Sequence, residues 1–299
     1  MPSQIDLAYV NAAPVVLPQR SKLRIALIGC GGTGSWLAPA IARLARVLNE
    51  QGQTVEVVFV DPDTVEVANV PRQNFCDAEI GRFKAETLAM RFSAAWGIPI
   101  RVIPARFDAA AVFAPHEWDT LTILVGCVDN PAARQSIARA LTGNATRPGT
   151  IWWLDCGNGR DNGQVLLGNA AHHRDLRAAF QIETLCAALP SPALLHPELL
   201  TATPDAAPPP LGGTCAQIAR RHAQSLMVNQ RVASEAADYL ARLLLARGSR
   251  DGGLCRFATY FDLASGSARS LYTTPATVAA ALHTTPVKLF GRRKQEKAK

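Results

Sequence analysis

The sequence predicts an α/β protein with a doubly wound, Rossmann-like sheet that is mostly parallel, has helices on both faces and ends in an antiparallel C-terminal extension. Two observations lead to this prediction. In the first half of the chain, short apolar runs typical of buried parallel strands alternate with patterns of helical period. In the second half, apolar runs are separated only by turn-forming residues, which indicates antiparallel hairpins.

The first half gives the elements of the parallel sheet in order. The run LRIALIGCG over 23–31 predicts a buried strand, and 34–49 follows it with large aliphatic residues at helical spacing. Pro39 stands near the start of that helix, where a missing N–H costs little. Further strands are expected at 55–60, 100–105 and 121–128, and further helices at 79–95 and 131–141.

The second half predicts antiparallel strands and one long helix. Residues 151–156 and 163–168 are strand-like and are joined by the turn-rich GNGRDN. The segment 187–213 carries seven prolines, which predicts a long mobile loop. A helix is expected at about 216–247, and a terminal hairpin at 255–272.

Charge and composition restrict the class of protein. We expect one domain over 22–275, between an N-terminal segment 1–21 and a basic tail 276–299. The formal charge is +7, but residues 288–299 hold six Lys or Arg against one Glu, so this tail supplies most of it. We therefore expect no nucleic-acid partner.

No apolar run reaches the ~18 residues of a membrane span, and the start lacks a secretory pattern. The seven cysteines form no CxxC pair, so we expect no zinc site and no disulfide framework, and a cytoplasmic location.

A glycine-rich turn joins the first strand to the first helix. Gly29, Gly31, Gly32 and Gly34 would let the backbone approach a phosphate at a helix N-terminus. Asp61 ends the next strand, where a carboxylate can bind ribose hydroxyls. These residues alone are compatible with a nicotinamide or flavin oxidoreductase, or with a tight turn that binds nothing.

The residues after Asp61 favour a triphosphate instead. Arg72 and Lys84 offer cations from two elements, and a dehydrogenase has no use for such a pair. A carboxylate at the end of the fourth strand, Asp129, could hold Mg²⁺ together with phosphate oxygens. Taken singly, Arg72 and Lys84 could be surface charges, and Asp129 a helix cap.

The glycine loop, the stretch D-x-D-x-V-x-x-x-N-x-x-R-Q-x-F from Asp61, the G-x-x-K ending at Lys84 and the strand-ending Asp129-Asn130 together resemble the ThiF/MoeB/HesA adenylyltransferases. These are relatives of ubiquitin-activating adenylation domains. The resemblance is good over 22–170 and weaker to about 275, and within the family the chain looks similar to the ThiF-like proteins of PRTRC gene clusters.

The resemblance implies an enzyme that binds ATP and Mg²⁺ and adenylates the C-terminal glycine of a ubiquitin-like or sulfur-carrier-like protein. It also implies a homodimer, for which the helices at 36–48 and 216–247 offer apolar faces. By position, Asp61 would hold the ribose and Asp129 the magnesium. The other nucleotide-binding positions would be Asp63, Asn69, Arg72, Gln73, Lys84 and Asn130.

The sequence also departs from the family pattern. Both zinc-binding CxxC pairs are missing, and no arginine near the start can be assigned a role in a partner's site. The loop 187–213 matches the family's crossover loop in position, and Cys215 stands where some relatives keep a thioester-forming cysteine. Cys215 could equally be structural, and a non-catalytic nucleotide-binding scaffold remains an alternative to an enzyme.

Overall fold

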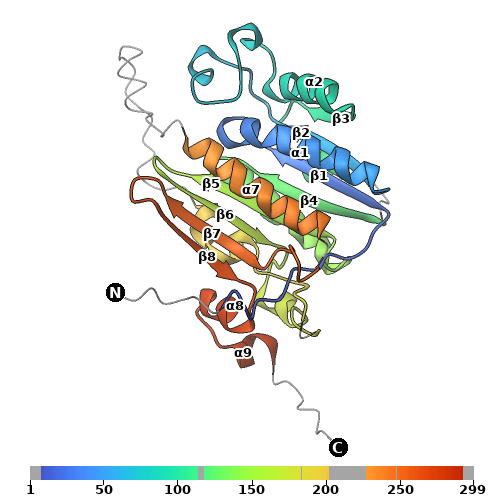
Figure 1. The fold of residues 1–299 in the computed structure, drawn as a ribbon, viewed down its shortest axis with the longest axis vertical. Coiled ribbons are helices and arrows are strands. Elements are labelled where there is room, and N and C mark those ends of the chain that lie inside the picture. Colours follow the sequence, from blue (N-terminus) through green and yellow to red (C-terminus); the bar gives the residue numbers. More distant parts are fainter. Residues whose placement is uncertain (1–7, 114–117, 183, 202–226, 247, 292–299) are drawn as a thin grey trace, which may run out of the picture.

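A computed structural model describes residues 8–113, 118–182, 184–201, 227–246 and 248–291. Its centre is one eight-stranded sheet in the order β3-β2-β1-β4-β5-β6-β7-β8 (Figure 1). The strands are β1 (Lys22–Ile28), β2 (Thr54–Val60), β3 (Ile100–Ile103), β4 (Thr120–Gly126), β5 (Ile151–Asn158), β6 (Asn162–Gly168), β7 (Arg256–Asp262) and β8 (Ser267–Tyr272).

The first five strands run parallel, as the apolar runs predict. β1 lies between β2 and β4, with Ile28 paired to Val60 on one side and to Gly126 on the other. All seven residues of β4 are buried, because helices cover both faces. The strand order reverses direction between β1 and β4, and open α/β sheets bind ligands at the carboxyl ends of the strands at such a point.

Helices cover both faces of this sheet. One face carries α1 (Gly32–Glu50), α2 (Lys84–Trp96) and α7 (Val228–Leu245), and α7 lies beside α1 although it is distant in sequence (Figure 1). The other face carries α3 (Ala109–Val112), α4 (Pro131–Ala140) and α5 (Pro192–Leu195). Alternate strand residues serve the two sides, so Ile25 packs in one core cluster and Ala26 in the other.

The predicted antiparallel extension is confirmed. β5, β6, β7 and β8 pair antiparallel in succession, and β7 and β8 form the expected hairpin. The phenol of Tyr239 on α7 hydrogen-bonds the Thr259 hydroxyl at 2.9 Å, which ties the long helix to this extension.

Three segments differ from the expected elements. The helix expected at 79–95 begins at Lys84, because a short 3-10 turn η2 (Asp77–Glu79) and Gly81 at φ +86° precede it. Part of the expected mobile loop, 187–201, is packed: it contains α5 and η5 (Pro197–Leu200), and Leu189 is buried. Of the helix expected at 216–247, Val228–Leu245 is helical and residues 216–226 lie outside the described residues.

The predicted basic tail is also partly folded. α8 (Pro275–Ala281) and α9 (Pro286–Phe290) bury Val278 and Leu289 against the core. Each helix begins with a Thr-Pro pair in which the threonine caps the first turn. This pair is a helix start signal, and it was overlooked because the segment was interpreted from its charge alone. Between residues 8 and 291, no helix in the described ranges combines the length and apolar character needed to cross a membrane.

Candidate functional site

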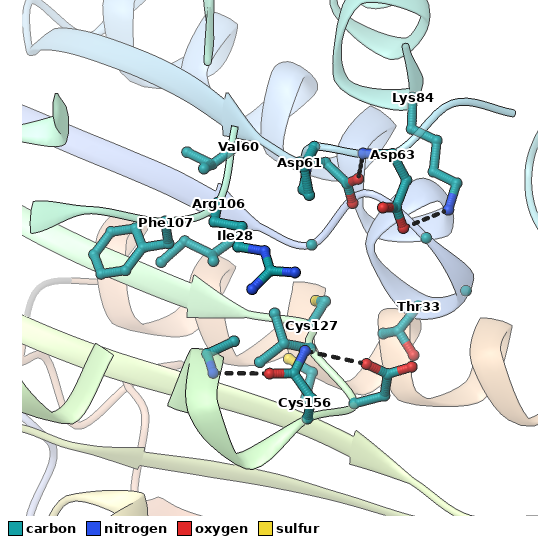
Figure 2. A pocket seen from close by; sticks show the side chains of 18 of the residues that line it. Ile28, Thr33, Val60, Asp61, Asp63, Lys84, Arg106, Phe107, Cys127 and Cys156 are labelled. Carbon is teal, nitrogen blue, oxygen red and sulfur yellow. Dashed lines mark hydrogen bonds and ion pairs between the residues drawn. The ribbon is translucent and has the colours of Figure 1, made fainter. Parts of the chain in front are cut away.

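A cavity of about 850 Å³ opens at the carboxyl edge of the parallel strands. Its walls come from the ends of β1, β2, β4 and β5, from the loop after β2 and from the first turns of α1 and α4 (Figure 2). Eleven of the sequence-predicted residues line it. They are Gly29, Gly31, Gly32, Asp61, Asp63, Asn69, Arg72, Gln73, Lys84, Asp129 and Asn130.

The glycines of the first loop have separate roles. Gly29 has φ +89°, and a Cβ there would lie 2.5 Å from the Cys127 carbonyl oxygen, so no other residue fits without displacing β4. A Cβ on Gly34 would lie 1.9 Å from the Gly29 carbonyl oxygen. Gly34 is not among the residues that line the cavity, and this close approach indicates a role in packing α1 against the loop; its assignment as a nucleotide contact stays a prediction.

Asp61 is fixed by backbone amides at the end of β2. Its Oδ2 accepts a hydrogen bond from the Cys30 N–H at 2.6 Å, and its Oδ1 accepts one from the Asp63 N–H at 2.8 Å. Burial raises the pKa of the Asp61 carboxyl, and these two hydrogen bonds and the Lys84 charge oppose that rise. Each oxygen keeps a second lone pair, so the carboxylate can accept hydroxyl groups from the cavity.

Lys84 stands at the first position of α2 and is 8% exposed. Its Nζ lies 3.1 Å from Asp63 Oδ2, and both side chains line the cavity (Figure 2). Because the Asp63 side chain is largely exposed, the ion pair is screened by solvent and can open at little cost. An anion in the cavity can therefore compete with Asp63 for the lysine.

The loop from 66 to 73 brings four further residues to the cavity, Glu66, Asn69, Arg72 and Gln73. The short helix η1 (Val67–Asn69) is closed by Asn69 itself, whose Oδ1 accepts the Glu66 N–H at 2.9 Å. The Arg72 carbonyl accepts the Trp36 Nε1–H at 3.3 Å, which fixes the backbone beside that guanidinium. Gln73 Oε1 is buried and has no hydrogen-bond partner among the described residues, so the side chain has an unused acceptor beside the cavity.

Asp129 and Asn130 follow β4. The sequence left open whether Asp129 binds Mg²⁺ or caps the next helix, and the structure gives the capping role to Asn130. Asn130 is the helix cap: its Oδ1 accepts the Ala133 N–H at 2.8 Å at the start of α4. Asp129 is exposed, and its Oδ1 lies 3.5 Å from Asn130 Nδ2. Its carboxylate is therefore available to the cavity.

The residue pattern missed a buried ion pair at the cavity wall. Arg134 lines the cavity, and its Nε donates to Asp155 Oδ1 at 3.1 Å. Asp155 on β5 is fully buried, which raises the pKa of its carboxyl, while the Arg134 charge lowers it. The spacing could have indicated Arg134, because it stands four residues after Asn130, one turn along the same helix.

A second missed group joins three distant segments. Asn158 Nδ2 lies 2.9 Å from Thr33 Oγ1 and 2.6 Å from Asn229 Oδ1, and all three residues line the cavity. Asn229 lies on α7, so this group of contacts connects the long helix α7 to the first turn of α1. No sequence signal points to Asn229, because its contact depends on how the helices pack. Arg106 and Phe107, after β3, also line the cavity and were not predicted (Figure 2).

Three cysteines of the described chain bear on the thioester question, Cys127, Cys156 and Cys186. Cys215 lies outside the described residues. Cys186, which directly precedes the loop 187–213, is fully buried, and burial raises the pKa of its thiol to about 12. Cys127 and Cys156 line the cavity, but a hydrogen bond with Cys127 together with burial raises the pKa of Cys156. Among the described residues, no cluster of three or more His, Cys, Asp or Glu could hold a metal ion.

The fold and the site define a doubly wound α/β protein with a polar, cation-bearing cavity at its topological switch point. Within that class, the ThiF family matches residues 13–183, more than half of the chain. The chain therefore belongs to the ThiF family, as the motifs predicted. No protein of curated function matches the sequence.

Solved structures with the same fold include E. coli MccB, which is 14% identical over 92% of this chain and 67% of that chain, with a TM-score of 0.53. MccB with ATP gives 14% identity over 96% of this chain and 70% of that chain, also with a TM-score of 0.53. PaaA matches at 14% identity over 84% of this chain and 64% of that chain, with a TM-score of 0.49. The chain thus spans about two thirds of the length of these proteins.

Proposed function

We propose that the protein is an ATP-dependent adenylyltransferase, which activates the C-terminal carboxylate of a small ubiquitin-like or sulfur-carrier-like protein, or of a peptide, as an acyl-adenylate. One observation carries the proposal: a single cavity is lined by the buried carboxylate Asp61 and by four cationic side chains, those of Arg72, Lys84, Arg106 and Arg134. Membership of the ThiF family supports it.

Each group has a place in ATP binding. Asp61, fixed by two backbone amides, accepts the ribose hydroxyls. Arg72 and Lys84 neutralise the phosphates, and the Gln73 amide can donate to them. Asn69 accepts a hydrogen bond from the Glu66 N–H and so stabilises the loop that forms this side of the cavity. We assign it this role as much as a phosphate contact.

Magnesium fits the donor set at the end of β4. Mg²⁺ is commonly held by one or two carboxylates together with substrate phosphates, and Asp129 presents one exposed carboxylate beside the cavity. When bound there, the ion would neutralise charge on the phosphates.

The reaction needs little from the protein beyond position and charge. A carboxylate oxygen of the acceptor attacks the α-phosphorus, the bond from that phosphorus to the bridging oxygen breaks, and pyrophosphate leaves. The acceptor carboxylate is already ionised near pH 7, so no general base is required. Arg72 and Lys84 stabilise the charge that develops on the phosphate oxygens.

Two alternatives make different demands on the cavity. A nicotinamide or flavin oxidoreductase would use the glycine loop and Asp61 but would leave the cations without a role. A non-catalytic scaffold would bind the nucleotide without turnover. The thioester at Cys215, the homodimer, the cytoplasmic location and the narrower PRTRC relationship stay predictions from the sequence.

Exchange of labelled pyrophosphate into ATP tests the proposal when each small protein encoded nearby is supplied as acceptor. We expect acceptor-dependent exchange in the wild type and a loss of about 10²–10³-fold in Asp129→Asn, the size expected for one lost electrostatic contact at the reacting phosphates. Asp251→Asn, an exposed aspartate in a distant turn, is the matched control. Normal exchange by Asp129→Asn would remove this residue from the site.

A further inference from the structure

A second cavity of about 530 Å³ lies at the β8 edge of the sheet, beside β7 and β8. Residues of α5, of η5 and of the end of α8, which packs next to β8 (Figure 1), also line it. None of the described residues that line it also lines the nucleotide cavity. Its volume is within the range of about 300–1,000 Å³ that is usual for small-molecule sites, so it has room for a ligand of its own.

Part of the wall of this second cavity is aliphatic. Four leucines from three elements line it: Leu194 and Leu195 of α5, Leu271 of β8 and Leu282, which follows α8. All four are partly buried against the core. Each therefore keeps apolar surface that a bound aliphatic group would remove from water.

The polar part of the wall has a cation available for a ligand. Arg269 of β8 is exposed, and no described residue forms a hydrogen bond or an ion pair with its guanidinium. Glu198, the carboxylate among the described residues of the wall, is engaged elsewhere, because its Oε1 lies 2.8 Å from His196 Nδ1. Arg269 thus retains its donors for an incoming anion.

A hydroxyl group is held in place next to this cation. Tyr260 of β7 pairs directly with Arg269 of β8, and directly paired residues in antiparallel strands project to the same face. The Tyr260 hydroxyl lies 2.6 Å from His196 Nε2, and the two rings are in edge-to-face contact with centroids 5.7 Å apart. Burial raises the pKa of Tyr260 to about 12, so the phenol stays uncharged near pH 7 and does not repel an anion.

The backbone of His283 is an independent sign that this wall binds something. Among the residues that the structure describes, His283 is the one non-glycine residue at positive φ, +52°. It ends α8 in a Schellman motif, in which the His283 N–H donates to the Ala280 carbonyl and the Thr284 N–H to the Ala279 carbonyl, both at 3.0 Å.

Glycine is the usual residue at this position of the motif, because a Cβ is disfavoured in the left-handed conformation. His283 instead adds an imidazole to the wall of the cavity at a cost in stability. Residues held in such conformations cluster at binding and active sites, where the side chain has a role that offsets the strain.

We propose that this cavity is a binding site for a small carboxylic acid with an aliphatic body, separate from the nucleotide cavity. Arg269 pairs with the carboxylate, to which a planar guanidinium can donate two parallel hydrogen bonds. The Tyr260 hydroxyl and the His283 imidazole complete the polar end, and the aliphatic body packs against the four leucines. The inference does not depend on adenylation.

Isothermal titration calorimetry of the full chain with hexanoate, octanoate and octanamide tests the class of ligand. Octanoate should bind about tenfold more tightly than hexanoate, because it buries two further methylene groups. Octanamide has the same shape without the charge and should bind about tenfold more weakly than octanoate. Equal affinities for octanoate and octanamide, or for octanoate and hexanoate, would overturn the proposal.

Two arginine variants show whether Arg269 holds the carboxylate. Arg269→Gln should reduce the affinity for octanoate to that for octanamide, while octanamide itself binds as before. Arg174→Gln, which removes an exposed arginine next to His173 of the same wall, should bind octanoate like the wild type. An undiminished affinity for octanoate in Arg269→Gln would contradict the assignment.

His283→Gly separates a binding role from a structural one, because its two expected effects have opposite signs. Glycine relieves the left-handed strain, so the melting temperature should rise by about 2 °C. The loss of the imidazole should weaken octanoate binding by about threefold, as for one hydrogen bond. A more stable variant that binds octanoate like the wild type would remove His283 from the site.

Titration of octanoate in the presence of excess ATP locates the site. The affinity should be unchanged, because the two cavities have no described lining residue in common. A loss of octanoate binding with ATP would place the carboxylate among the cations of the nucleotide cavity and would overturn the second site.

Discussion

At the scale of single residues, the pair Arg134–Asp155 places a buried carboxylate against a buried cation at the cavity wall. Asp155 is fully buried, and Arg134 forms an ion pair with it through a 3.1 Å contact between Nε and Oδ1. Burial raises the pKa of the Asp155 carboxyl, so the folded protein holds this proton more tightly than the unfolded chain does. Asp155 therefore costs stability as the pH rises from about 4, the ordinary pKa of an aspartate, through its raised folded value.

Removing Arg134 should make this cost visible. In Arg134→Gln the opposing charge is absent, so the folded pKa of Asp155 rises further. We expect a small loss of unfolding free energy at about pH 5 and a loss of about 3–5 kcal/mol at about pH 8, by urea denaturation. The double variant Arg134→Gln/Asp155→Asn should lose this pH dependence. Equal losses at both pH values in the single variant would contradict the assignment.

Sequence patterns located the site residues that stand in sequential motifs, and missed those that only packing brings together. Asp61, Arg72 and Lys84 follow the glycine loop in order and line one cavity. Asn229 lies at the cavity because α7 packs beside α1, and Asp155 contributes through its hydrogen bond with Arg134. No sequence spacing therefore indicates either residue. Gly34 shows the converse, because its motif position fits a phosphate contact while its surroundings show a packing role.

At the scale of elements, the glycine loop and the first turn of α1 are packed backbone against backbone. The Ser35 N–H donates to the Gly31 carbonyl at 2.9 Å, and the Gly34 Cα faces the Gly29 carbonyl closely. Strand and helix periodicity predicted β1, α1, β2 and β4 within a few residues. It failed at η2, α5, α8 and α9, whose starts depend on local caps and turns rather than on a period.

Gly34→Ala tests this close packing of α1 against the glycine loop. A methyl group there meets backbone rather than a movable side chain, so we expect a loss of about 1–3 kcal/mol of unfolding free energy, the usual cost of overpacking. Gly52→Ala, beyond the other end of α1, is the control: it has φ +85° and open space, and should cost only the conformational term of about 1 kcal/mol. A Gly34→Ala protein as stable as the wild type would show that the loop adapts.

At the scale of the whole molecule, the structure changes the argument for a dimer. Two helices were expected to meet a partner through apolar faces, at 36–48 and 216–247. The face of the first and that of the described part of the second, Val228–Leu245, pack within the chain: Leu37, Ile41, Val232 and Leu240 are all buried. These faces are not available for a partner. Among the described residues, four of the exposed large apolar side chains lie between residue 67 and the middle of α2, namely Val67, Ile80, Phe83 and Met90, and the others are scattered over the chain.

We still expect a symmetric dimer, and place its contact on that side of the molecule. Sedimentation should give twice the 32.0 kDa of one chain, and Met90→Asp should shift the protein toward the monomer. Ile182→Asp, which charges an exposed apolar residue elsewhere, should leave the mass unchanged. A wild-type mass of 32.0 kDa across the micromolar range would reject the dimer.

The central claim is that the cavity at the end of β1, β2 and β4 holds a nucleoside triphosphate, and isothermal titration calorimetry tests it without an acceptor. We expect ATP to bind at least about tenfold more tightly than NAD⁺ or FAD. Arg72→Ala and Lys84→Ala should each weaken ATP by about tenfold or more, since each removes a charge-assisted phosphate contact, while AMP affinity changes little. Arg82→Ala, an exposed arginine in the same loop, should bind ATP like the wild type. Tighter binding of NAD⁺ than of ATP, or equal losses for AMP and ATP in the two variants, would contradict the account.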